Sequence, residues 1–93
     1  MRPVEAGDER VITPNPEGVH TRNNGRHVRV LLPIRPGEYF GDGRKLSPRM
    51  RHTDYWLVAP LDGRPLVAKK MNSNETYPAP TACVREVCLG EIE

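Results

Sequence analysis

The residues best suited to chemistry lie in one short basic stretch with aromatic side chains on either side. Four cationic residues fall between positions 44 and 51, and a tyrosine precedes and follows them. Cations beside aromatic rings are what proteins that bind single-stranded nucleic acid use to hold phosphates and stack bases. We predict a binding surface for a polyanion or an acidic partner made of Tyr39, Arg44, Lys45, Arg49, Arg51 and Tyr55.

Catalytic groups are sparse. Ser47 and Ser73 fall in expected loops outside any nucleophile motif. Cys83 with a histidine stays open as a nucleophile and base, although 93 residues offer little depth to exclude water. Asp42 and Asp62 precede glycines and are explained as turn residues. The sequence therefore predicts a protein that is not an enzyme.

The histidines and cysteines do not form the pattern of a metal site or a disulfide either. His20, His27 and His52 form no closely spaced pair with one another or with a cysteine, so we expect no metal and no cofactor. Cys83 and Cys88 are five positions apart, which in an extended chain puts their Cα atoms roughly 16 Å from each other on opposite faces. That is beyond disulfide reach, so two free thiols are expected.

The charge is distributed unevenly along the chain. Segment 18–72 holds eleven Lys or Arg against four Asp or Glu, a net charge of +7, while the two ends are acidic and bring the total to +2. A field from the basic middle would favour nucleic acid, but the sequence pI of 8.7 is below the value of about 9 typical of such domains.

Proline and glycine limit the elements that can position these residues. Ten Pro and eight Gly in 93 residues leave no room for a long amphipathic helix, so short strands between turns are expected. Ser47-Pro48 could start one short helical turn. The expected strands are 9–13, 26–32, 54–59 and 66–71, with a weaker one at 38–41 and a 3₁₀ turn leading into a short strand within 83–89.

The arrangement of these strands follows from their patterns. In 26–32, Val28, Val30 and Leu32 should share one face, since strand side chains alternate. Residues 55–58 are apolar on both faces and predict a strand buried on both sides. We expect 54–59 and 66–71 to pair as a hairpin around Asp62-Gly63, and 72–81 to be a long polar loop.

These pieces resemble the small SH3-like barrels, including short uncharacterised proteins of bacteria and their prophages. The matching pieces span roughly residues 9–88: Gly25-x-x-Val28-x-Val30, Pro36-Gly37, Tyr55-Trp56-Leu57-Val58, Asp62-Gly63 and Val84-Arg85-Glu86-Val87. The resemblance implies an all-β barrel of about five short strands. It implies no activity, because such barrels host many functions.

The whole sequence therefore predicts a flexible leader at 1–8, one small barrel at 9–89 and an acidic tail at 90–93. Without an apolar segment that could act as a signal peptide or cross a bilayer, we expect a cytoplasmic monomer that binds no membrane. The function we favour is a non-enzymatic binding module with a protein-binding or assembly role. The alternative is binding of single-stranded DNA or RNA through the basic, aromatic-flanked surface.

Overall fold

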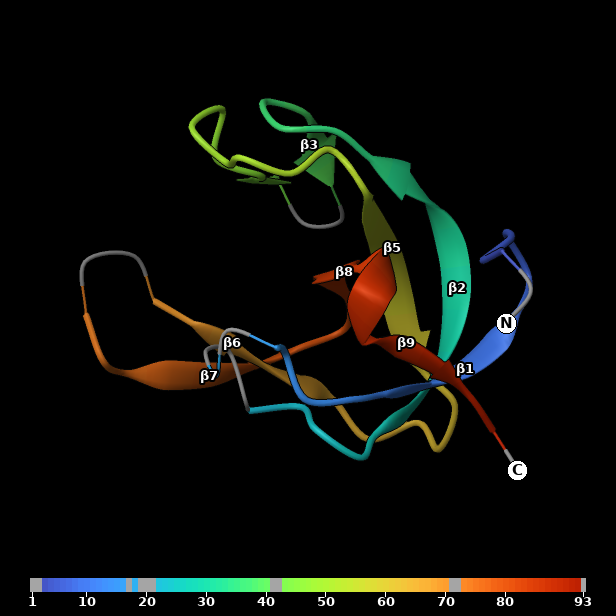
Figure 1. Ribbon diagram of the computed structural model, residues 1–93. Coiled ribbons are helices and arrows are strands. Elements are labelled where there is room, and N and C mark those ends of the chain that lie inside the picture. The colour runs from blue at the N-terminus through green and yellow to red at the C-terminus, as the bar shows by residue number, and fades with distance from the viewer. Residues whose placement is uncertain (1–2, 17, 19–21, 41–42, 71–72, 93) are drawn as a thin grey trace.

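The computed structural model describes residues 3–16, 18, 22–40, 43–70 and 73–92, and these form an antiparallel five-stranded sheet with two small hairpins beside it (Figure 1). The elements are β1 (Glu9–Ile12), β2 (His27–Ile34), β3 (Tyr39–Phe40), β4 (Arg44–Lys45), β5 (Tyr55–Pro60), β6 (Leu66–Lys69), β7 (Thr76–Ala79), β8 (Ala82–Arg85), the 3₁₀ turn η1 (Glu86–Cys88) and β9 (Leu89–Glu91). The sheet order is β8-β5-β2-β1-β9, and β3–β4 and β6–β7 pair separately. The predicted all-β class is confirmed, and the main sheet has five strands, while four further short strands form the two hairpins.

The sheet is strongly curled, because its two outer strands are consecutive in the chain. β8 and β9 lie at opposite edges, yet only the three residues of η1 join them. The amide of Thr13 donates to the Cys88 carbonyl at 2.8 Å, and the Trp56 indole donates to the Glu86 carboxylate at 3.0 Å. In Figure 1 the segment β8–η1–β9 lies across the face of β2 and β5. The 3₁₀ turn and the strand after it are confirmed.

Strand β5 separates two small apolar clusters. Val58 belongs to the larger one, with Trp56 packed against it, while Tyr55 and Leu57 belong to the smaller one. The prediction of a strand buried on both faces is therefore confirmed. The larger cluster comprises Val4, Ile12, Val28, Val30, Val58, Leu66 and Leu89, and the smaller comprises Ile34, Leu46, Tyr55 and Leu57.

A β-bulge in β2 lets this strand serve both clusters. Val30 pairs with Val58 and Leu32 pairs with Leu57, so the register shifts by one residue at Leu31. Because a one-residue shift exchanges the two faces, Ile34 reaches the smaller cluster and Leu32 leaves the larger one. Leu32 is 45% exposed, so the prediction that it shares a core face with Val28 and Val30 is wrong.

The hairpin prediction for 54–59 and 66–71 is also wrong. β5 pairs with β2 on one side and β8 on the other, so it offers no edge to β6. β6 pairs with β7 instead, and the predicted loop 72–81 therefore contains a strand. Pro78 is tolerated there, since a two-stranded sheet consists of edges, where a missing N–H is harmless.

Both chain ends contribute more to the domain than the sequence predicts. Val4 is buried in the larger cluster, and Gly7 donates to the Val30 carbonyl at 2.7 Å, so the described part of the predicted leader is packed. β9 places Glu91 opposite Arg10, where an acidic tail was expected. Ser47-Pro48 starts only a turn, and none of the described residues form a helix long and apolar enough to span a bilayer.

Arg10 is the one fully buried charged side chain among the described residues, at 0% exposure. Its guanidinium lies 3.0 Å from the Asp8 carboxylate and donates to the carbonyls of Leu89 and Pro3 at 3.3 and 3.2 Å. A buried charge is tolerated only when it is paired and hydrogen-bonded. Arg10 thus ties the first residues and β9 to β1.

Candidate functional site

The β3–β4 hairpin carries two stacked pairs of a cation and an aromatic ring. Tyr39 pairs with Lys45 and Phe40 with Arg44. The Lys45 ammonium lies 5.5 Å from the centroid of the Tyr39 ring, and the Arg44 guanidinium 4.8 Å from that of Phe40. Because neighbouring side chains in a strand point to opposite faces, one pair faces the protein and the other faces away.

The inward pair attaches the hairpin to the domain. Phe40 packs against the smaller apolar cluster. The Arg44 guanidinium donates to the Thr81 carbonyl at 2.6 Å and to the Thr81 hydroxyl at 3.0 Å. Arg44 therefore holds the hairpin in place, a structural role that the sequence prediction did not distinguish from ligand contact.

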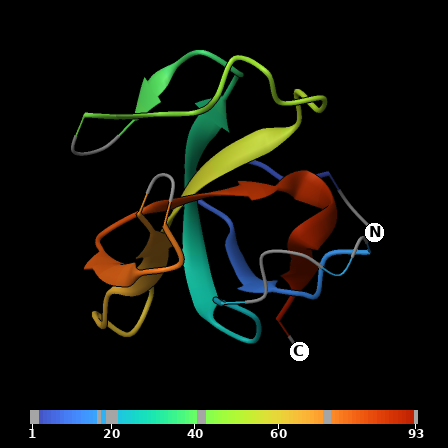
Figure 2. The ribbon, with the colours of Figure 1, turned by 90° about the vertical axis from the view of Figure 1, so that its left-hand side faces the viewer.

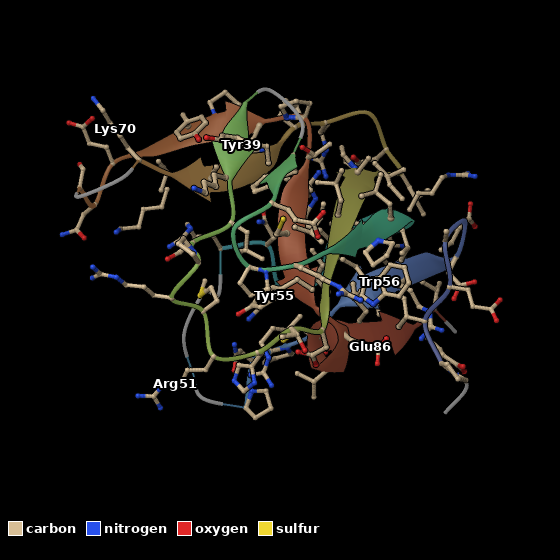
Figure 3. The ribbon with its side chains drawn as sticks, turned by 90° about the horizontal axis from the view of Figure 1, so that it is seen from above. Tyr39, Arg51, Tyr55, Trp56, Lys70 and Glu86 are labelled. Atoms are coloured by element: carbon tan, nitrogen blue, oxygen red, sulfur yellow. The ribbon has the colours of Figure 1, made fainter. Side chains whose placement is uncertain are left out.

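The outward pair is the exposed part of the predicted surface. Tyr39 is 69% exposed and Lys45 is exposed beside it. Arg49 and Arg51 are also exposed, on the turn that follows β4, and Figure 3 shows Arg51 pointing away from the protein. Tyr55 is 8% exposed and belongs to the smaller cluster, so its predicted place on the surface is wrong. Tyr55 was included because it follows the basic stretch in the sequence, but it begins β5, which is buried on both faces.

The β6–β7 hairpin adds a cationic and aromatic surface that the sequence analysis missed. Tyr77 is 36% exposed, and Lys69 and Lys70 are exposed near it. Lys70 lies 3.9 Å from the Glu75 carboxylate, and both side chains are largely in solvent. The signal was present, since 66–69 and 76–79 are separated by a polar turn, but the two prolines of 78–80 suggested a loop.

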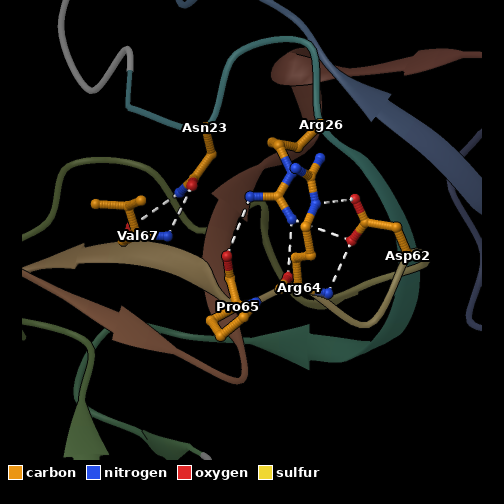
Figure 4. Close-up of polar contacts among 6 residues, drawn as sticks. All are labelled: Asn23, Arg26, Asp62, Arg64, Pro65 and Val67. Carbon is orange, nitrogen blue, oxygen red and sulfur yellow. Dashed lines mark hydrogen bonds and ion pairs between the residues drawn. The ribbon is translucent and has the colours of Figure 1, made fainter.

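A cluster of polar residues joins the 22–26 loop to the start of the β6–β7 hairpin (Figure 4). The Asn23 amide pairs with both backbone groups of Val67, donating to its carbonyl at 3.0 Å and accepting from its N–H at 2.9 Å. Arg26 donates to the carbonyls of Arg64 and Pro65 and lies 3.2 Å from Asp62. The loop turns at Gly25, which has a φ of +83° that glycine adopts readily.

Asp62 stands between two guanidinium groups in this cluster. Hydrogen bonds from the backbone and side chain of Arg64, together with the charges of Arg26 and Arg64, lower the pKa of this carboxyl. Hydrogen bonds from backbone N–H groups and cations favour the ionised form. Asp62 therefore works as the turn residue that the sequence predicts, and its surroundings favour the ionised carboxylate.

The two thiols are free and unsuited to nucleophilic chemistry. Burial raises the pKa of Cys83 to about 12, and burial also raises the pKa of Cys88. A thiol with a raised pKa holds little of the reactive thiolate at neutral pH. Within the described ranges, no three His, Cys, Asp or Glu side chains gather to hold a metal ion, and His20 lies outside those ranges.

The chain was compared with protein-family models, with curated proteins and with solved structures, and none of them matches. The case for function therefore rests on the surface described above.

Proposed function

We propose that this chain is a small non-enzymatic binding module whose β3–β4 hairpin binds single-stranded nucleic acid. The observation that carries the proposal is the outward pair of Tyr39 and Lys45, an exposed ring with an ammonium beside it. Bases stack on exposed aromatic rings, and cations hold the phosphates that join them. Arg49 and Arg51, exposed on the next turn, extend the positive surface.

The placement of charge supports this proposal. Residues 35–52 include five Lys or Arg against two acids, Glu38 and Asp42. The acidic Glu9 and Glu91 lie on β1 and β9, which pair with each other, and Figure 1 shows these strands at the end of the molecule away from β3. Glu9 and Glu91 therefore do not cover the basic hairpin. A surface with an excess of positive charge attracts a polyanion.

The absence of an enzymatic role is part of the proposal. Cys83 is held protonated by burial, and Asp62 is engaged by two arginines. A nucleophile or base needs a reactive protonation state and an accessible position.

The test is fluorescence anisotropy of a labelled, mixed-sequence 12-nucleotide DNA over a range of salt concentrations. We expect binding that weakens as salt rises, because phosphate neutralisation releases counterions. Lys45→Gln should lower the slope of log K against log salt by about 0.7, the contribution of one phosphate contact on a single strand.

Arg29→Gln is the matched control, since Arg29 is an exposed cation on the five-stranded sheet, paired with Glu9 at 3.1 Å. It should leave the slope unchanged. The proposal fails if the wild-type chain shows no change in anisotropy at low salt, or if both substitutions have equal effects.

A role in binding a protein partner is the second candidate, favoured by one observation. Leu31 and Leu32 are adjacent, apolar and exposed at the bulge of β2. Adjacent exposed leucines in a small domain are suited to a protein contact. A pull-down in which the wild-type chain retains a partner and Leu32→Ser does not would favour this function over the first.

A further inference from the structure

Lysines and exposed aromatic rings are confined to the two small hairpins. The chain has three lysines, and all three lie on β4 or at the end of β6. Of its five aromatic side chains, all of which the structure describes, Tyr39 and Tyr77 are the two most exposed. The five-stranded sheet carries neither feature, although it contains most of the strand residues.

The two hairpins stand on the same side of the molecule. Figures 1 and 2 show β3–β4 above β6–β7, both extending beyond the five-stranded sheet. Arg44 on β4 bonds to Thr81, which lies two residues after the end of β7, so the hairpins are linked at their base. In Figure 3, Tyr39 and Lys70 lie toward one end of the molecule, and Trp56 and Glu86 toward the other.

On the β6–β7 hairpin, Tyr77 and Lys70 share one face. Leu66 pairs with Ala79 and Ala68 pairs with Tyr77, and the amide of Lys70 continues the ladder by donating to the Glu75 carbonyl at 2.9 Å. Since strand faces repeat every second residue, these three pairs lie on the same face. Leu66 and Ala79 are buried at the base of this face, while Tyr77 and Lys70 lie farther along it and are exposed.

The Lys70–Glu75 ion pair is weak enough to yield to a ligand. The side chains are 68% and 75% exposed and the charged atoms 3.9 Å apart. Exposed ion pairs contribute little and are screened by salt. A phosphate of a nucleic-acid strand carries the same charge as the Glu75 carboxylate, so it can replace that carboxylate beside the Lys70 ammonium.

We infer that one nucleic-acid strand contacts both hairpins, with one base stacked on Tyr39 and another on Tyr77, and with Lys45 and Lys70 each beside a phosphate. This inference rests on the proposed function and extends it to a second surface. It also sets the class of ligand: a single strand several nucleotides long, because the bases of a duplex are already stacked on one another.

The test compares labelled oligothymidylates of 4 and 12 nucleotides by anisotropy. The wild-type chain should bind the longer strand more tightly than the extra phosphates alone explain. Tyr77→Leu with Lys70→Gln keeps an apolar side chain at 77 and should weaken binding of the 12-mer by roughly fivefold or more, the effect of losing one stacked base. Glu75→Gln removes the competing carboxylate and should tighten binding of the 12-mer.

The outcomes separate the two proposals. If Lys45→Gln weakens binding of the 12-mer while the Tyr77 and Lys70 substitutions and Glu75→Gln leave it unchanged, the inference is overturned and the proposed function stands. If the wild-type chain binds neither strand at low salt, both are overturned. A 12-base-pair duplex that binds as tightly as the single strand overturns the assignment of a single-stranded ligand. Arg29→Gln, outside both hairpins, should match the wild type throughout.

Discussion

The five-stranded sheet and the β3–β4 hairpin differ in how many side-chain contacts hold them in place. In the sheet, apolar side chains on both faces of β5 join distant parts of the chain, and so does the hydrogen bond from the buried Arg10 to the Leu89 carbonyl. The hairpin has two strands of two residues each, and Arg44 and Phe40 attach it to the rest. The other two residues of these strands, Tyr39 and Lys45, face solvent. The sheet is therefore stabilised by many contacts, and the hairpin by few.

This difference shows where binding can evolve without loss of the fold. A residue in the sheet that faces a cluster contacts several strands, so changing it affects stability. Tyr39 and Lys45 face away from both clusters, so they are available to a ligand. Substitutions in the sheet should change unfolding, and substitutions on the outward face of the hairpin should change binding.

The largest effect should come from Asp8→Ala. The carboxylate of Asp8 is an anion 3.0 Å from the guanidinium of the fully buried Arg10. Removing one partner of a buried ion pair is strongly destabilising, so we expect a loss of about 3 kcal/mol in the free energy of unfolding. Urea denaturation followed by Trp56 fluorescence measures it.

The double substitution Asp8→Ala with Arg10→Met is the control for this interpretation. It removes the charge together with its partner and should recover part of the lost stability. If the double variant is less stable than Asp8→Ala alone, the buried charge is not the cause of the loss.

A smaller effect is expected where the sheet meets the β6–β7 hairpin. Asn23→Ala leaves the N–H and carbonyl of Val67 without their side-chain partner, at a cost of about 1–2 kcal/mol. Hydrogen exchange at the Val67 amide should speed up more than at other amides of β6. Asn74→Ala, at an exposed asparagine, is the matched control and should change neither quantity.

Alternation and turn chemistry were sufficient to predict the all-β class, most of the strands and the core positions Val28, Val30, Leu57 and Val58. All four are buried. The pairing of β6 with β7 could not be predicted, because it depends on β2 and β8 already occupying both edges of β5. Local sequence also could not reveal the bulge at Leu31, which matters only because two clusters exist on opposite faces of the sheet.

The candidate site was predicted only in part, for a related reason. Composition identified the cationic and aromatic residues. Side chains that are adjacent in a strand point to opposite faces, so neighbours in sequence do not share one surface. Arg44 and Lys45 are neighbours, yet one bonds to Thr81 and the other faces solvent. Tyr55 begins β5, which is buried on both faces, so its side chain lies in the core and not on the predicted surface. Tyr77 lies exposed on strand β7, in a segment where the prolines had suggested a loop.

The attachment of the β3–β4 hairpin gives a third prediction. Thr81→Val keeps the shape of the side chain and removes the hydroxyl that accepts from Arg44, while the Thr81 carbonyl continues to accept. We expect a loss of about 0.5–1 kcal/mol, confined to the hairpin. Hydrogen exchange should speed up at Leu46, whose amide donates to Glu38, and stay unchanged at Val30. An equal change at both amides would show that the hairpin is not an independent region.

The smallest effect should appear in the acid range, at Asp62. The folded state lowers the pKa of this carboxyl below its ordinary value of 3.8, so its ionised form stabilises the fold above that pH. The contribution is lost as the pH falls through the folded-state pKa. Asp62→Asn should therefore be slightly less stable than the wild type at pH 6, with the difference shrinking below pH about 4. Thermal unfolding at a series of pH values measures this difference. A difference that stays constant down to pH 2 would mean that Asp62 stabilises the turn through its shape and neutral hydrogen bonds, and not through its charge between Arg26 and Arg64.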